Sequence, residues 1–195
     1  MLKEGLITSS GWLENGVWPW LGSAHGIAHN FVGNRKKAIA LLYAVANHAS
    51  PLGTWVEEQQ TRDVGAATAG DVSNAEASAV FLHLVRNLIA QEHLENLELL
   101  TGIPWESLVP GGRIEFNGGF TEFGPLTLKL KLSSDGTSAD LFISAIDGRG
   151  SRGRPVVFLQ SLKEKGYVFE DGSSLPDVLE SSWGKELRMR FRMAT

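Results

Sequence analysis

The chain has 195 residues, no cysteine and a formal net charge of −4. The lack of cysteine excludes disulfides and thiolate zinc sites, and the acidic balance argues against nucleic acid as the main partner. The opening residues lack the apolar stretch of a signal peptide, and no run of about 18 apolar residues could span a membrane. We therefore expect one domain or two small ones with no membrane partner, and the sequence leaves the localisation unknown.

The first half of the chain has the apolar spacing of α-helices. We expect three helices, over residues 21–33, 35–49 and 73–93. Gly33 stops the first, because glycine readily adopts the left-handed conformation that ends a helix. Pro51 stops the second, because proline disfavours helix at the residue before it. Ser73 and Glu76 have the spacing of a capping box, so Ser73 is expected to begin the third helix.

In the second half the apolar period changes to two. Residues 126–132 alternate without exception, and residues 186–193 do the same. Further strands are expected over 113–117, 139–145 and 154–162. Glycine-rich turns such as DGRGSRG (147–153) separate them, a pattern typical of an antiparallel sandwich. The sequence therefore predicts an α+β chain with helices in residues 1–96 and an antiparallel β-sandwich in residues 97–195.

Two stretches resemble parts of a known family. Residues 16–59, GVWPWLGSAHGIAHNFVGNRKKAIALLYAVANHASPLGTWVEEQ, are similar to the late part of the (α/α)6 toroid of glucoamylase-type, six-hairpin glycoside hydrolases. Residues 97–136, LELLTGIPWESLVPGGRIEFNGGFTEFGPLTLKLKLSSDG, are similar to the close of uncharacterised bacterial glycosidase-like proteins, in which a toroid runs into a small β-sandwich. The resemblance implies a carbohydrate substrate, hydrolysis of an O-glycosyl bond, and no cofactor.

The resemblance also implies that the chain is not a whole enzyme. An (α/α)6 toroid has twelve helices, whereas about three are expected here, and the general acid of the family comes from an earlier hairpin. Three helices, one of them nearly apolar all round, also lack the neighbours that would bury their apolar faces. We therefore expect a C-terminal fragment, inactive by itself, that binds a missing N-terminal toroid segment or self-associates.

In such a toroid the loops that lead into inner helices line the mouth of the active site. Trp18 and Trp20 precede the first expected helix, and Trp55 lies in the loop that leads towards the third. Tryptophan is large, flat and amphipathic, so these three are the expected sugar-stacking residues. All three should lie on one face of the helical half together with Glu57 and Glu58.

The adjacent glutamates compete for the role of catalytic base. Glycoside hydrolysis uses two carboxyl groups, one as the acid and one that activates water or attacks the anomeric carbon. The family pattern near the base is a Pro-x-Gly turn, a short spacer and Glu-Gln. Aligned without a gap from Pro51 and Gly53, the base is Glu57; aligned on the Glu-Gln pair, it is Glu58, before Gln59. We favour Glu57 and keep both as candidates.

Asp71 and His25 are further candidate substrate-binding residues. Asp71 lies just before the third expected helix and can face the same mouth. His25 and His29 share a helix face through their i, i+4 spacing, which is also the histidine spacing of the HExxH zinc motif. Gly26 stands where that motif needs glutamate, so we expect no metal site and assign His25 to sugar contact.

Two other functions fit parts of the sequence. A non-catalytic module that binds carbohydrate or a partner subunit would keep the tryptophans and not depend on the carboxylates. A polysaccharide lyase would use tyrosine or histidine near an acidic sugar, but Tyr43 and Tyr167 lie in an outer helix and in the sandwich. The basic residues of the strands alternate with apolar ones, which indicates the solvent face of a sheet and not a nucleic-acid surface.

Overall fold

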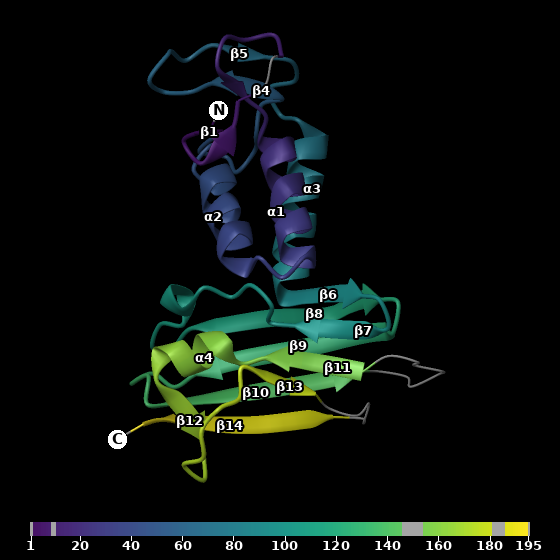
Figure 1. The fold of residues 1–195 in the computed structure, drawn as a ribbon, viewed down its shortest axis with the longest axis vertical. Helices are drawn as coiled ribbons and strands as arrows, with labels where there is room; N and C mark the ends of the chain where they lie inside the picture. Colours follow the sequence, from purple (N-terminus) through teal and green to yellow (C-terminus); the bar gives the residue numbers. More distant parts are fainter. Residues whose placement is uncertain (1, 9–10, 146–153, 181–185, 195) are drawn as a thin grey trace. The chain divides into compact units, whose positions relative to one another are not determined.

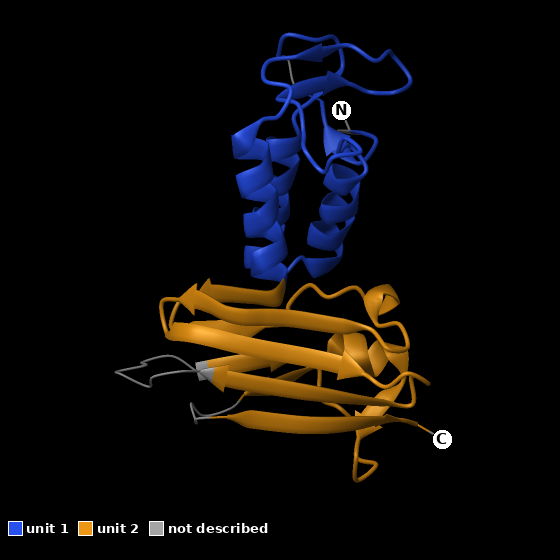
Figure 2. Ribbon diagram, turned by 180° about the vertical axis from the view of Figure 1, so that it is seen from behind, with its two compact units in different colours: residues 1–88 blue, residues 89–195 orange. Residues whose placement is uncertain are grey.

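The computed structural model describes residues 2–8, 11–145, 154–180 and 186–194. Over these residues the protein is a mixed α+β chain with four α-helices and mostly antiparallel sheets (Figure 1). It divides into two compact units, residues 1–88 and residues 89–195 (Figure 2). The turn expected at 147–153 lies outside the described residues.

Three helices make up much of the first unit: α1 (Pro19–Phe31), α2 (Arg35–Ala46) and α3 (Ala75–Ile89). Two glycines of α1 lie where its neighbours come closest. A Cβ atom at Gly26 would lie 2.8 Å from Cδ2 of Leu84 in α3, and one at Gly22 would lie 2.8 Å from Cγ2 of Val45 in α2. The absence of side chains at these positions therefore lets α1 pack closely against both neighbours.

The two ends of α1 follow ordinary helix chemistry. The helix begins at Pro19, slightly earlier than expected, with proline at the position where its missing N–H group costs nothing. Gly33 has a φ of 78°, and the N–H groups of Gly33 and Asn34 donate to the carbonyls of Asn30 (3.0 Å) and His29 (2.8 Å). This Schellman arrangement satisfies the last carbonyls and confirms the stop predicted at Gly33.

The start of α3 corrects the capping prediction. The side-chain oxygen of Asn74 accepts a hydrogen bond from the N–H of Ala77 at 2.6 Å, which makes Asn74 the N-cap. The helix therefore begins one residue later than a capping box of Ser73 and Glu76 requires. Glu76 is instead an exposed acidic residue of the first turn, where it complements the helix dipole.

The end of α3 also differs from the predicted helix over 73–93. The chain leaves α3 directly into β6 (Ala90–His93), which pairs antiparallel with β7 (Asn96–Leu99). Leu97 and Leu99 of β7 are fully buried. Pairing with this buried strand holds residues 90–93 as a strand, although their sequence pattern predicted a helix. The second unit accordingly begins before residue 96, where the sequence placed the boundary.

Short strands close the first unit at the end where α1 and α3 begin. β3 (Gly16–Val17), β4 (Glu58–Gln60) and β5 (Thr68–Ala69) form an antiparallel sheet in the order β3-β4-β5. A separate pair joins β1 (Leu2–Lys3) to β2 (Leu6–Ile7). The three-stranded sheet is not among the elements expected from the sequence, and it positions the candidate site.

The second unit contains two sheets and a short helix. The larger sheet is antiparallel in the order β12-β14-β10-β9-β8, and its strands are β8 (Arg113–Thr121), β9 (Gly124–Leu132), β10 (Ser138–Ala145), β12 (Tyr167–Phe169) and β14 (Leu187–Met193). The other has the order β13-β11-β7-β6, with β11 (Arg154–Phe158) and β13 (Val178–Glu180). A 3-10 turn, η1 (Trp105–Ser107), and α4 (Gln160–Lys165) complete the unit.

One core joins the two sheets of this unit. The alternating leucines of β9 are buried as predicted, and they share a single hydrophobic cluster with Leu97, Leu99 and Val157 of the other sheet. Two details differ from the predicted antiparallel sandwich. β7 and β11 pair in parallel, and the strand expected over 154–162 ends at Phe158, after which α4 begins.

The outer face of the larger sheet carries the basic residues of the alternating strands. Arg190 of β14 lies opposite Asp140 of β10 and forms an ion pair with it at 3.1 Å. Lys131 of β9 lies on the other side of Asp140, and Arg188 stacks over the ring of Phe142 at 4.9 Å.

Among the described residues, no helix has the length and apolar character needed to cross a bilayer.

Candidate functional site

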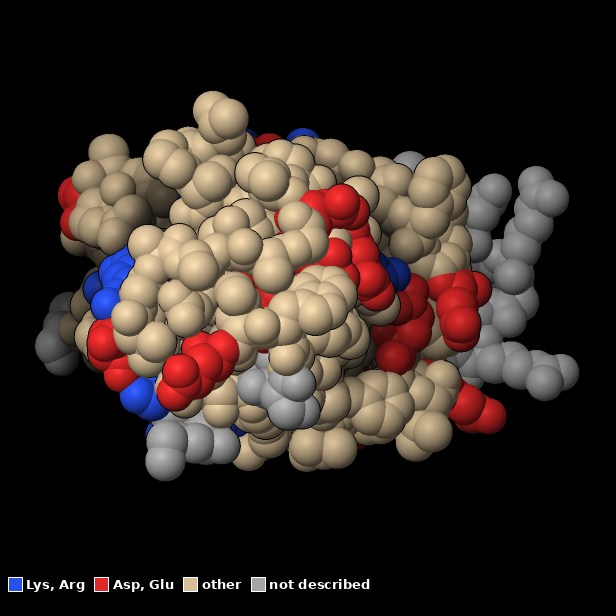
Figure 3. Space-filling view, turned by 90° about the horizontal axis from the view of Figure 1, so that it is seen from above, with Lys and Arg blue, Asp and Glu red and all other residues tan. Residues whose placement is uncertain are grey.

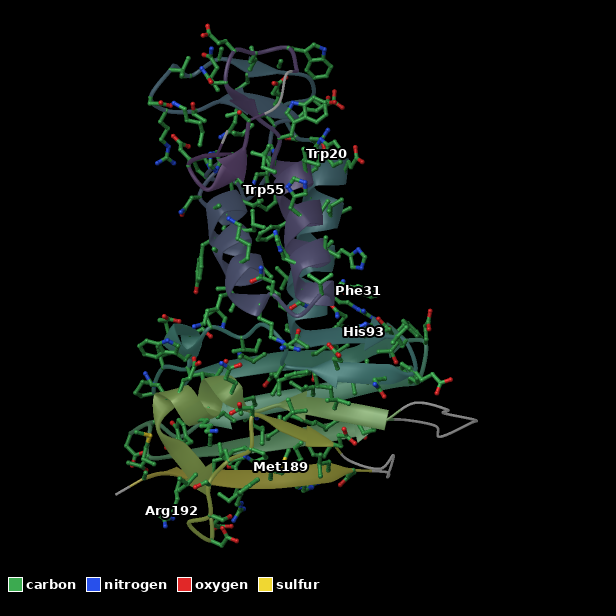
Figure 4. All side chains as sticks on the ribbon, viewed as in Figure 1. Trp20, Phe31, Trp55, His93, Met189 and Arg192 are labelled. Carbon is green, nitrogen blue, oxygen red and sulfur yellow. The ribbon has the colours of Figure 1, made fainter. Side chains whose placement is uncertain are left out.

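The three-stranded sheet brings the two candidate loops together. Gly16 pairs with Gln60 and Val17 with Gln59, so Trp18, the next residue of the first loop, comes alongside Glu58. Five candidates therefore belong to the same end of the first unit: Trp18, Trp20, Trp55, Glu57 and Glu58. They do not share one open face, because Trp55 and Glu58 are buried. Figure 4 shows Trp20 and Trp55 at this end of the helices, with Phe31 at the opposite end of α1.

Glu58 is a fully buried carboxylate, with 0% of its surface exposed. Its Oε2 accepts a hydrogen bond from the backbone N–H of Trp12 at 2.7 Å, and its Oε1 accepts one from the N–H of Leu13 at 3.4 Å. Buried charges require such partners, because burial strips them of water. Glu58 is therefore engaged by the turn that precedes β3 and is closed to solvent.

Glu57 has a different environment from its neighbour. It is half-buried, and its Oε2 accepts the backbone N–H of Asp71 at 3.4 Å, while its own N–H donates to the Asp71 carbonyl at 3.0 Å. A Cβ atom at Gly70 would lie 2.3 Å from Oε2 of Glu57, so the carboxylate lies against this glycine. The structure thus brings Asp71 beside Glu57, and the Asp71 side chain is exposed.

The two glutamates have different surroundings because Glu58 begins β4, whereas Glu57 lies in the bend just before that strand. Glu58 pairs with Ala69 and faces the turn around Gly16, whereas Glu57 lies beside Gly70. The two carboxylates are adjacent in sequence but lie against different parts of the chain, which separates their possible roles.

Three tryptophans form a continuous aromatic cluster at this end. The ring centroids of Trp12 and Trp18 lie 6.0 Å apart, and those of Trp18 and Trp20 lie 5.5 Å apart. Trp12 is 62% exposed, and Trp18 and Trp20 are half-buried. We call Trp12, Trp18 and Trp20 the tryptophan cluster. The indole N–H of Trp18 is buried, with no acceptor among the described residues.

Trp12 was not among the residues singled out from the sequence. A turn signal does precede Trp18, since Asn15 and Gly16 form the dipeptide most typical of a tight reversal. Asn15 has a φ of 53°, and the N–H of Gly16 donates to the Leu13 carbonyl at 3.0 Å. That reversal folds the chain back, and an Asn-Gly pair between two tryptophans could have indicated that they meet.

Trp55 lies in the core and not in the cluster. It is 5% exposed, its indole N–H donates to the Val45 carbonyl at 2.8 Å, and its ring packs on Phe81 at 4.6 Å between centroids. In this position the ring has no face open to a ligand. Its effect on the site is indirect, because its carbonyl accepts the N–H of Asn74 at 2.7 Å and so ties the loop to the start of α3.

His25 lies on α1, further along the helix than the tryptophan cluster, and is half-buried. Among the described residues, no group of three or more histidine, aspartate and glutamate side chains gathers as a metal site would require.

Figure 3 looks onto the end that carries β4 and β5, where acidic side chains border a mainly uncharged surface. The arrangement thus places aromatic rings and carboxylates at one end of the first unit.

Comparison of the chain with protein-family models, with curated proteins and with solved structures finds no match. The case for a function therefore depends on the residues and geometry of this end of the first unit. The half-buried Glu57 and the tryptophan cluster are the parts of that geometry that can act on another molecule.

Proposed function

We propose that the chain carries part of the active site of a glycoside hydrolase that acts on an oligo- or polysaccharide. In this proposal Glu57 is the carboxylate base, and the tryptophan cluster stacks on the apolar C–H faces of sugar rings. The observation that carries it is that the half-buried Glu57 and the tryptophan cluster, of which Trp12 is exposed, lie at the same end of the three helices. α1 and α3 would be inner helices of a toroid and α2 an outer one.

The chemistry needs a second carboxyl group. The base activates a water molecule or attacks the anomeric carbon, while an acid protonates the oxygen of the departing sugar. Asp71 would bind substrate beside the base, and His25 would contact a more distant sugar. The acid would come from a further toroid segment, so we expect this chain alone to hydrolyse no glycoside at an appreciable rate.

Removing the exposed indole of Trp12 is expected to weaken sugar binding. Trp12→Ala should raise the Kd for a soluble hexasaccharide by roughly 5- to 30-fold, because a stacked aromatic ring contributes about 1–2 kcal/mol. Isothermal titration calorimetry against maltohexaose, cellohexaose and xylohexaose measures this. Trp105→Ala is the matched control, since Trp105 is also exposed but belongs to the other unit, and its Kd should equal that of the unaltered chain. Equal Kd values for both variants would contradict the proposal.

A subunit-interaction module is the second candidate, and the outer faces of the helices favour it. α3 exposes apolar residues at helical spacing, namely Ala75, Ala79 and Leu82, and Val72 in the segment before the helix is also exposed. Tyr43 of α2 and Phe31 of α1 are also exposed. Apolar surface arranged in this way usually marks a contact surface, for a missing toroid segment or for a second copy of the chain.

The purified chain is accordingly expected to self-associate through α3. Leu82 is 67% exposed, and Leu82→Glu should shift the chain towards monomer because a charge cannot be buried in an apolar contact without a partner. Sedimentation velocity over a range of concentrations measures the shift. Leu94→Glu applies the same substitution at an 83% exposed residue of the other unit and should leave association unchanged. A chain that is monomeric at every concentration would rule out this surface as a self-association site.

A further inference from the structure

The turn that carries Trp12 is arranged around a single buried side chain. Glu58 accepts the backbone N–H groups of Trp12 and Leu13. A Cβ atom at Gly11 would lie 2.6 Å from either carboxylate oxygen of Glu58, and one at Gly16 would lie 2.0 Å from Oε1. The main chain at both ends of the turn thus comes against the carboxylate, and no residue larger than glycine fits there without a shift.

The residue that Glu58 holds most closely is also the exposed member of the tryptophan cluster. The shorter of the two hydrogen bonds, at 2.7 Å, comes from the N–H of Trp12. The Trp12 side chain is 62% exposed, and its ring lies tilted by 36° beside that of Trp18, with 6.0 Å between the ring centroids. An exposed indole has little packing of its own to fix it, so its place depends on how its backbone is held.

We propose that Glu58 is a positioning residue for the tryptophan cluster. Its carboxylate holds the 11–16 turn so that the Trp12 indole lies beside Trp18, and it does this without touching a ligand. The part that concerns sugar binding rests on the proposed function; the part that concerns the turn does not. The neighbouring glutamates then have different roles. Glu58 fixes the position of the 11–16 turn, and Glu57 is the half-buried carboxylate that can contact a ligand.

The chemistry of the donors explains why a carboxylate stands here. The backbone N–H groups of Trp12 and Leu13 both donate to Glu58, and an ionised carboxylate only accepts hydrogen bonds and has two oxygens to do so. Such charge-assisted hydrogen bonds are shorter and stronger than those between neutral groups. Glutamine has the same shape, but its NH2 group would face one of the two N–H donors and leave that donor without an acceptor.

Amide hydrogen exchange of residues 11–16 tests the proposal. In Glu58→Gln, the amide oxygen should keep the N–H of Trp12, while the N–H of Leu13 exchanges on the order of 10–100-fold faster than in the unaltered chain. In Glu58→Ala, both amides should exchange faster by this factor, and the near-ultraviolet circular dichroism of the tryptophan cluster should fall. The amides of α2 and of the second unit serve as internal references. Unchanged exchange at Trp12 and Leu13 in Glu58→Ala would overturn the proposal.

Trp12→Ala is the matched control, because it removes the indole but leaves both backbone donors. It should weaken hexasaccharide binding while the two amides stay protected, whereas Glu58→Ala should lose binding and protection together. If Glu58→Ala does not fold, the selective loss at Leu13 in Glu58→Gln decides the matter. If no hexasaccharide binds the unaltered chain, the proposed function fails, and the exchange data alone support or overturn the role of Glu58. Full hexasaccharide affinity in a folded Glu58→Ala, with affinity lost in Trp12→Ala, would overturn it as well.

Discussion

Replacing Gly16 by alanine is expected to destabilise the first unit by about 2–3 kcal/mol. The new Cβ atom would lie 2.0 Å from Oε1 and 2.7 Å from Cδ of Glu58, so the carboxylate has to move. It is fully buried and hydrogen-bonded to the 11–16 turn, so movement breaks those bonds in a place without water. Urea unfolding monitored by tryptophan emission measures the loss.

A double-mutant cycle separates this contact from any general effect of the substitution. In a Glu58→Ala background the oxygen that alanine would meet is gone, so Gly16→Ala should cost almost nothing there. The interaction energy should therefore approach the whole cost of the single substitution. The backbone of Gly16 is not in the left-handed region, so no separate strain is expected. An unchanged cost in the Glu58→Ala background would show that the two side chains do not compete for space.

Periodicity was enough to predict the regular parts of both units. The helical spacing placed α1 and α2, and Gly33 ended α1 as expected, because the left-handed conformation is a local property of glycine. The strict alternation of residues 126–132 predicted the buried leucines of β9 in the same way. These features depend on a few neighbouring residues, which a sequence displays directly.

Pairings between distant residues could not be predicted in this way. β3 and β4 contain two and three residues, too few to show a period, and their contact joins residues about forty apart. The parallel pairing of β7 with β11 is equally non-local. The change from α3 into β6 has a local partner, β7, but the helical spacing of the preceding residues conceals it. In each case tertiary contacts decided the conformation of a short segment with no clear pattern of its own.

The candidate site was predicted in outline and not in detail. The loops that lead into α1 and α3 do meet, but the sequence could not tell which glutamate is buried, because both have the same chemistry. Contacts with distant glycines make the difference: Glu58 lies against Gly11 and Gly16, whereas Glu57 lies against Gly70. The sequence also could not tell which tryptophans are exposed. Trp55, an expected sugar-stacking residue, is buried, whereas Trp12, which was not singled out, is exposed. Trp55 packs against Phe81 and donates to the Val45 carbonyl, so a ligand cannot contact its ring. The turn at Gly16 reverses the chain and places Trp12 beside Trp18.

The other large effect concerns catalysis by a complete site. If the proposed function holds, Glu57→Gln in an assembly of this chain with a toroid segment that brings the acid is expected to lower kcat by about 10²–10⁴-fold, the usual contribution of a general base. Glu58→Gln should lower kcat less, because it alters the 11–16 turn and not the reacting atoms. Glu76→Gln is the control for the loss of a carboxylate, since Glu76 is exposed on α3, and its kcat should be unchanged.

The most direct test of the assignment is chemical rescue of turnover in that assembly. With an activated aryl glycoside as substrate, added formate should restore part of the activity of Glu57→Ala, because a small carboxylate can enter the space of the lost base. Formate should not restore Glu58→Ala, whose defect would lie in the position of the 11–16 turn. Rescue of Glu58→Ala with none for Glu57→Ala, or full turnover in Glu57→Ala without formate, would contradict the assignment of Glu57 as the base.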